Sequence, residues 1–165
     1  NNSGLSKKKA LMIKINVISN TPKWKKYLKN PDLYIKKQII KLNKKQKKYR
    51  SKLFTCTLLL SEGKEIKALN KKFRNRNRET DVLSFPFFDK KELKKKLKNE
   101  KEIYLGDIII NLSRVKFKKD SKQFLLEFNK LWVHGLVHLF GYDHKKDKDF
   151  FDMLKIEKRL LSYLS

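Results

Sequence analysis

The chain has 165 residues, 39% of them hydrophobic and 12% aromatic, which suits one packed domain and excludes general disorder. A formal net charge of +26 favours polyanionic partners, above all nucleic acid and then acidic lipid head groups. Only six of the 43 basic residues are arginine, and a coding bias towards Lys, Asn, Ile and Phe would produce much of this charge without any ligand. The arginines are therefore more informative than the lysines about a phosphate-binding function, since a guanidinium can bind phosphate in a bidentate manner.

Cysteine content and hydropathy predict a cytoplasmic protein. Cys56 is the single cysteine, so no internal disulfide can form, and its apolar surroundings favour a buried structural thiol over a nucleophile. No apolar stretch approaches the roughly 18–20 residues that cross a bilayer, and no signal-type apolar core follows the basic N-terminal residues. We expect no membrane association. We expect residues 1–11 to be a flexible basic extension and 12–165 to form one domain.

The first half of the domain alternates strands and helices. Residues 13–19 alternate apolar and polar side chains, which predicts a half-buried strand, and Pro22 permits a short helical turn after it. An amphipathic helix is predicted from a cap at Asp32, with an apolar side formed by Leu33, Ile35, Ile39 and Leu42. Residues 52–61 carry no charge after Lys52, so we expect a central strand buried on both faces.

The middle of the chain combines a helix, a polar loop and two strands. Helical spacing in residues 62–73 places three apolar residues together, Ile66, Leu69 and Phe73. A polar loop is predicted at 75–80, followed by an edge strand whose Pro86 cannot donate to a ladder. Residues 89–102 resemble a solvated, helical insertion, and 104–111 a further strand.

Two helices close the chain. The first runs from a cap at Asp120 or Ser121 to Phe140, and its broad apolar surface predicts a central position, with Gly141 ending it. The second, 147–164, is amphipathic, with an inward set of Phe150, Phe151, Leu154, Leu161 and Leu164. The order of elements predicts an α+β fold with a small mixed sheet of about four strands packed by helices.

All three histidines lie within HGLVHLFGYDH, residues 134–144. His134 and His138 are four apart on the central helix, so their rings project from the same face, and the turn after Gly141 can return His144 as a third ligand. The alternative is a chance cluster of surface or core histidines. The spacing favours one metal ion, and imidazole ligands favour zinc, with nickel as the alternative.

The spacing H-x-x-x-H-x-x-G-x-x-H matches the metzincin zinc proteases, but Gly135 stands where those enzymes carry their catalytic glutamate. Peptide hydrolysis therefore lacks its proton acceptor. A metal held by three imidazoles can instead polarise a phosphoryl oxygen or lower the pKa of a bound water towards 7. A phosphodiester substrate agrees with the basic composition.

The chain resembles the YbeY endoribonucleases, the ribosomal RNA maturation factors. The likeness rests on four segments: LNKKFR (69–74), ETDVLSFPF (79–87), LGDIII (105–110) and HGLVHLFGYDH (134–144). It implies a metalloprotease-like single domain with a central zinc-binding helix. It also implies cleavage of single-stranded RNA, maturation of the 3′ end of small-subunit ribosomal RNA, and ribosome quality control.

The resemblance assigns residues as well. The family binds one zinc ion, and its metal ligands fall on His134, His138 and His144. Its functionally important arginine falls on Arg74. From the sequence alone, Arg74 lies where a helix gives way to a polar loop, a position that suits either a phosphate clamp or a surface helix end. Arg76 and Arg78 suit either contacts to an RNA backbone or a solvated loop.

Two carboxylates near these segments have open roles. Asp143 suits either a carboxylate that orients a ligand imidazole or a turn residue. Asp81 suits a cap, a hydrogen-bond acceptor behind a ligand or a proton shuttle, with structural use favoured for it and for Ser84.

Three hypotheses follow. The first is a zinc-dependent endoribonuclease acting through Arg74 and the three histidines on ribosomal RNA, with the small ribosomal subunit or assembly factors as partners. The second is a ribosome-associated assembly factor with a structural zinc. The third is a metalloprotease with a base from elsewhere, such as Asp143. The sequence assigns neither a general base nor an oligomeric state.

Overall fold

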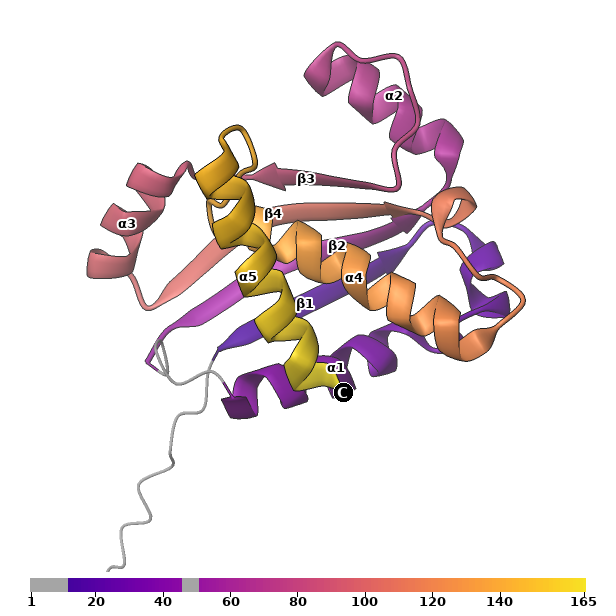
Figure 1. The fold of residues 1–165 in the computed structure, drawn as a ribbon, viewed down its shortest axis with the longest axis horizontal. Helices are drawn as coiled ribbons and strands as arrows, with labels where there is room; N and C mark the ends of the chain where they lie inside the picture. Colours follow the sequence, from indigo (N-terminus) through magenta and orange to yellow (C-terminus); the bar gives the residue numbers. More distant parts are fainter. Residues whose placement is uncertain (1–11, 46–50) are drawn as a thin grey trace, which may run out of the picture.

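A computed structural model describes residues 12–45 and 51–165. The predicted extension at 1–11 lies outside these residues. The described chain forms a four-stranded mixed sheet in the order β1-β2-β4-β3, with helices packed mainly on one face (Figure 1). This α+β arrangement confirms the predicted fold class. The strands are β1 (Ile13–Ser19), β2 (Leu53–Ser61), β3 (Val82–Pro86) and β4 (Glu102–Asn111).

Strand directions follow from the connections. β1, β2 and β4 are parallel, whereas β3 pairs with β4 in the antiparallel sense and forms the predicted edge. β2 is central, but only one of its faces is fully buried. Its alternate residues Phe54, Cys56, Leu58 and Leu60 are buried, while those between them are partly exposed. The prediction of two buried faces was wrong because the helices cover mainly one side of the sheet.

The helices include α1 (Pro31–Lys45), α4 (Ser121–Leu139) and α5 (Asp147–Leu164), which share the core side of the sheet (Figure 1). α4 crosses the centre, as its apolar surface predicts, and its largest side chains are fully buried: Phe124, Phe128 and Trp132. α2 (Gly63–Arg74) lies over one end of the opposite face, and α3 (Lys90–Asn99) connects β3 to β4. Two short 3-10 turns, Pro22–Lys26 and Leu112–Arg114, complete the set.

Several local predictions are confirmed. The Asp120 side chain caps α4 by accepting from the backbone N–H groups of Lys122 and Gln123, both at 3.1 Å. Gly141 ends the helical segment with a φ of 92°. The insertion at 89–102 contains a helix that begins with an Asp89–Glu92 capping box.

Other local predictions were wrong. Asn30, not Asp32, caps α1, because the Asn30 side chain accepts from the backbone N–H of Leu33 at 3.0 Å. Leu33 is exposed, and so is Phe73 on α2. On α5 the side chains of Phe150 and Phe151 are exposed, whereas Leu164 is buried as predicted, together with Met153 and Leu160, which the prediction did not name. Helical spacing gives a stripe but does not say which edge of the stripe the neighbouring elements cover.

In the part of the chain that the structure describes, no helix is both long and apolar enough to cross a bilayer.

Candidate metal centre and basic groove

The three histidines converge as their spacing predicts. His134 and His138 lie one turn apart on α4, with their Nε2 atoms 3.1 Å apart. The turn at Gly141 brings the His144 ring to 5.3 Å from that of His138 and 6.3 Å from that of His134, centroid to centroid. One ring nitrogen from each residue lies within 4.8 Å of the others. The structure thus places all three imidazoles in position to bind a metal ion.

Hydrogen bonds on the far side of two rings orient them. His134 Nδ1 lies 2.5 Å from Glu157 Oε1 on α5, and His138 Nδ1 lies 2.9 Å from the carbonyl oxygen of Tyr142. A carboxylate and a carbonyl only accept, so in the neutral imidazoles Nδ1 carries the proton and Nε2 presents a lone pair. Burial, followed by the neighbouring His134 and His144, lowers the pKa of His138, although the Tyr142 carbonyl opposes this shift. Metal ligation requires this neutral form.

The donor set fits zinc. A tetrahedral zinc ion with Zn–N bonds of about 2.0–2.1 Å sets its nitrogens about 3.3–3.4 Å apart, close to the 3.1 Å between the two Nε2 atoms on α4. His144 is exposed on a turn, so it can adjust to complete the set. Three imidazoles leave a fourth position open, as in catalytic zinc sites. Nickel shares the preference for imidazole.

Glu157 was missed by the sequence analysis, whereas Asp143 was named and does not orient a ligand ring. The Asp143 carboxylate accepts from the backbone N–H of His144 at 2.7 Å, as a turn residue does. Glu157 lies 23 residues from His134 and reaches it only because α5 packs along α4. Nothing in the local sequence distinguishes Glu157 from the other acidic residues of a charged helix.

Gly135 explains the departure from the protease motif. It faces the sheet, where an added Cβ would lie 2.6 Å from Ile108 Cγ2 and 3.1 Å from Ser84 Oγ. The Ser84 hydroxyl donates to the Gly135 carbonyl at 3.2 Å, which holds α4 close to β3. This position therefore has no room for a glutamate side chain, and Ser84 has the structural use that the sequence favours.

Arg74 ends α2 beside the edge strand. Its guanidinium donates to the Ser84 carbonyl at 2.7 Å and lies 5.5 Å from the centre of the Phe85 ring. These contacts fix an exposed side chain that would otherwise move freely. Beyond it, Asn75 takes a left-handed conformation, and the buried Asn70 amide donates to the Arg78 carbonyl at 3.0 Å. The loop that follows α2 is thus shaped by defined hydrogen bonds.

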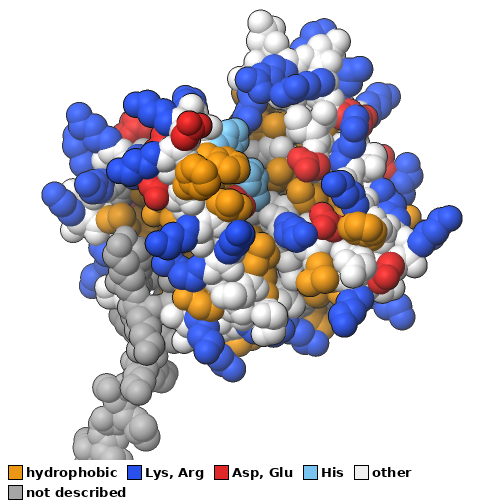
Figure 2. Space-filling view, viewed as in Figure 1, with side chains coloured by type: hydrophobic (Ala, Val, Ile, Leu, Met, Phe, Trp, Pro, Cys, Tyr) orange, Lys and Arg blue, Asp and Glu red, His pale blue; other side chains and the backbone are white. Residues whose placement is uncertain are grey.

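A groove of about 790 Å³ joins these elements. Its walls carry the three histidines and the cationic side chains Arg74, Arg76, Arg78, Lys90 and Lys145. Figure 2 shows histidine side chains in a recess with Lys and Arg on either side. Asp81 also lines the groove. Its carboxylate accepts from the backbone N–H of Val82 at 2.8 Å, a local contact that agrees with the structural use favoured by the sequence. The groove can therefore hold an anionic ligand beside a metal ion.

Fold and site together define an α+β domain with a candidate three-histidine metal centre at the end of its central helix, the arrangement of a metal-dependent hydrolase. The sequence model described as endoribonuclease YbeY matches residues 18–165. The chain belongs to this family.

Relatives agree with the assignment. A protein named endoribonuclease YbeY from Pelagibacter ubique is 41% identical over 157 residues, covering 93% of this chain and 97% of the relative. One of the same name from Thermodesulfovibrio yellowstonii is 36% identical over 129 residues, 75% of each chain. A solution structure of a Thermotoga maritima protein shares the fold, with a TM-score of 0.56 at 23% identity, covering 92% of this chain and 89% of the other.

Proposed function

We propose that this protein is a zinc-dependent endoribonuclease that cleaves single-stranded RNA and matures the 3′ end of small-subunit ribosomal RNA. Membership of the YbeY family, whose relatives are named endoribonucleases, supports the reaction and the RNA substrate. The observation that carries the proposal is the convergence of three imidazole nitrogens in a groove lined with arginine. The small ribosomal subunit or its assembly factors are the proposed partners.

In this proposal His134, His138 and His144 hold one zinc ion, with Glu157 and the Tyr142 carbonyl fixing two of the rings. When bound, zinc supplies Lewis-acid chemistry towards a phosphoryl oxygen. The acceptors on the outer nitrogens of His134 and His138 place the proton of each neutral ring on Nδ1, which keeps the Nε2 lone pairs directed at the ion.

Arg74 is the proposed phosphate-binding residue. One guanidinium nitrogen is occupied by the Ser84 carbonyl, and the remaining N–H groups of the fork are free to donate to phosphate oxygens in the groove. Because the group is already fixed in place, little side-chain entropy is lost on binding. Such a donor stabilises the negative charge that develops on the phosphate during cleavage.

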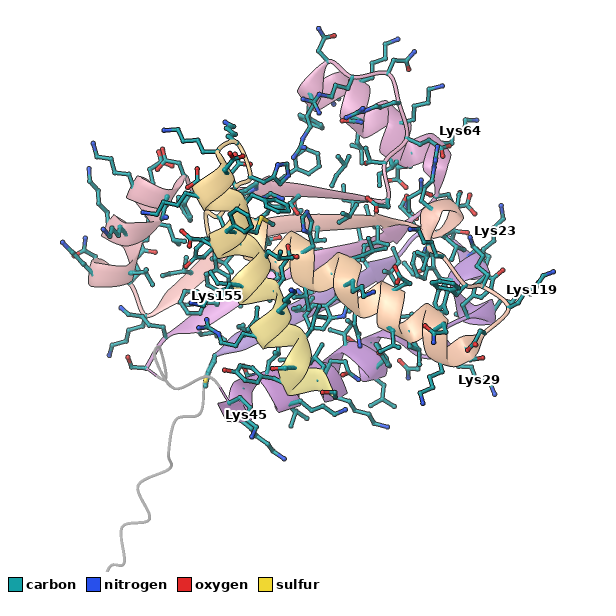
Figure 3. The ribbon with its side chains drawn as sticks, viewed as in Figure 1. Lys23, Lys29, Lys45, Lys64, Lys119 and Lys155 are labelled. Atoms are coloured by element: carbon teal, nitrogen blue, oxygen red, sulfur yellow. The ribbon has the colours of Figure 1, made fainter. Side chains whose placement is uncertain are left out.

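Arg76 and Arg78 extend the cationic wall beyond Arg74. Both are exposed and line the groove, so they can contact successive phosphates of one strand without reading its sequence. The lysines are distributed differently: Lys23, Lys64 and Lys119 project from one end of the sheet, and Lys45 from the opposite end (Figure 3). This spread favours general attraction of RNA, whereas Arg74, Arg76 and Arg78 are gathered at the groove together with Lys90 and Lys145.

Geometry weighs against the two rival hypotheses to different extents. A peptidase needs a carboxylate beside the open metal position, and Gly135 has no space for one, while the Asp143 carboxylate binds the backbone of the next residue. An assembly factor with a structural zinc needs a closed four-ligand site, whereas three imidazoles with an exposed third ligand favour an open one.

The test is cleavage of a labelled single-stranded RNA by purified protein, with and without a chelator. We expect chelation, His138→Ala and Arg74→Ala each to abolish or strongly reduce cleavage. Arg159→Ala is the matched control, since Arg159 is exposed on α5 and does not line the groove. Cleavage that survives chelation and both substitutions would come from a contaminating nuclease and would refute the proposal.

A further inference from the structure

The face of the sheet turned away from α1, α4 and α5 is only partly covered. Strand register aligns its side chains in three rows across β1, β2, β4 and β3. The row nearest α2 consists of Leu83, Ile109 and Leu59, against which Ile66 and Leu69 pack, and the exposed Ile18 at its end. The next row consists of Asn16, Thr57, Asp107 and Phe85. The last row consists of Lys14, Thr55 and Tyr104, and the Phe87 ring packs against Tyr104 at its end. Beyond the first row, the residues are exposed or half-buried.

A bulge in β4 shapes the open part of this face. The register shifts between Thr55 and Cys56, and Gly106 takes a φ of 136° opposite the shift. As a result, Tyr104 and Asp107, three residues apart, lie on the same face, and the Tyr104 hydroxyl donates to Asp107 at 2.5 Å. The Thr57 hydroxyl donates to the hydroxyl oxygen of Tyr104 at 2.7 Å. These bonds fix the Tyr104 ring.

Four aromatic rings, Phe73, Phe85, Phe87 and Tyr104, form what we call the aromatic strip. Phe87 is 59% exposed and meets Tyr104 edge to face at 4.9 Å between centroids. Phe73 is 60% exposed and meets Phe85 in the same way at 5.5 Å. Phe85 and Tyr104 are half-buried, so Phe73 on α2 and Phe87 after β3 are the exposed members of the two pairs. Large exposed rings held in fixed positions beside a sheet mark a binding surface rather than a core.

Cations border the strip. Lys72 Nζ lies 5.2 Å from the Phe73 ring centre, and the Arg74 guanidinium lies 5.5 Å from that of Phe85. Lys14 stands at the far end of the Tyr104 row. Beside the rings, from β4 towards β1, lie hydrogen-bonding groups where a protein interface core would be apolar: Asp107, Thr57, Thr55 and Asn16. Rings, cations and such groups together suit unpaired bases, which stack on aromatic faces and offer donors and acceptors at their edges.

The strip and the metal centre lie on opposite sides of one edge strand. On β3, Ser84 faces α4, where it bonds to Gly135, whereas the neighbouring Phe85 faces the strip. Arg74 contacts both residues, so it belongs to the groove and to the strip at once. A single strand that crosses β3 at Arg74 would therefore place bases on the strip and a phosphate near the histidines.

We propose that the aromatic strip is a stacking platform for unpaired bases of single-stranded RNA, which leads the strand across β3 into the groove. The inference rests on the proposed function for its choice of RNA. It extends the substrate site to a face that carries neither the histidines nor the metal.

The test measures binding without cleavage, using chelator-treated protein and a fluorescein-labelled single-stranded RNA of fixed length. Loss of one stacking ring is expected to weaken binding by about 5- to 150-fold, so we expect Phe87→Ala to fall in that range and Phe87→Trp to bind as wild type. Phe151→Ala removes a ring of similar exposure (66%) from α5 and is expected to leave RNA binding unchanged. An abasic oligomer of the same length is expected to bind wild type and Phe87→Ala equally.

Salt dependence separates stacking from charge. Phe87→Ala is expected to leave the slope of log affinity against log salt unchanged, while Arg74→Ala reduces it. Equal binding of the base-containing RNA by wild type and Phe87→Ala overturns the inference, whether or not wild type cleaves RNA. A change of oligomeric state in Phe87→Ala with RNA binding unchanged also overturns the inference, because the strip would then be a contact with a second copy of this chain. Wild type that binds RNA through Phe87 yet never cleaves it, with zinc present, refutes the proposed function alone.

Discussion

Glu157 is expected to control how tightly the three histidines hold zinc, although it is not a ligand. Its carboxylate lies 2.5 Å from His134 Nδ1, and its side chain is only 18% exposed, so water replaces it poorly. His138 is oriented by a backbone carbonyl, which no substitution removes. Substitution of Glu157 therefore removes the hydrogen bond that orients His134 without changing a metal ligand.

The expected loss of zinc affinity depends on which hydrogen-bond acceptor remains for His134 Nδ1 after the substitution. Loss of a carboxylate behind a ligand histidine weakens metal binding by about 10- to 100-fold. Glu157→Gln keeps an acceptor oxygen for Nδ1 but loses the charge, so we expect about 10-fold, or about 1.4 kcal/mol. Glu157→Ala leaves the ring without a protein partner there, and we expect about 100-fold, or about 2.7 kcal/mol.

The assay is a zinc titration against a competing chromogenic chelator, with wild type and variants at matched ionic strength. Glu127→Gln is the matched control: it also removes a carboxylate from a helix, 20% exposed and paired with Lys130 at 3.0 Å, but it contacts no histidine. Thermal melts of the metal-free proteins check that all variants fold. A zinc affinity of Glu157→Ala within twofold of wild type and Glu127→Gln would refute the orienting role.

Three further outcomes test the core and the site. Burial, with a smaller effect from Asp107, raises the pKa of the Cys56 thiol to about 12, so a thiol reagent at pH 8 should label the native protein far more slowly than the denatured one. Phe128→Ala should destabilise the protein by about 3–5 kcal/mol in denaturant melts because Phe128 is fully buried, whereas Phe151→Ala should cost less than about 0.5 kcal/mol. Free zinc at 100 times its dissociation constant should stabilise wild type by about 2.7 kcal/mol and His138→Ala by much less.

Features that depend on residues close together in the sequence could be predicted from the sequence alone. Histidines four apart on a helix, with a glycine to end it, bring three rings together by local geometry alone, and the structure places them so. The edge position of β3 follows from Pro86, and the capping of α4 from Asp120. Each of these depends on a few consecutive residues.

What the sequence left out depends on packing between distant elements. Glu157 meets His134 only through the contact of α5 with α4, and Phe150 and Phe151 proved exposed because α4 covers the other edge of their helix. The open outer face of β2 was missed because Thr and Leu suit a buried strand as well as a half-covered one.

Gly135 also limits how this site can change by mutation. In a zinc protease the residue after the first histidine supplies the base, so a single substitution to glutamate is the shortest route from one chemistry to the other. Here any side chain at that position meets Ile108 on β4 and Ser84 on β3 before it can turn towards the groove. Ile108 would have to be replaced as well, since its Cγ2 lies 2.6 Å from the added Cβ, and the Ser84 hydroxyl that bonds to the Gly135 carbonyl would have to shift. The tight contact between α4 and the sheet therefore separates the two chemistries by more than one mutation.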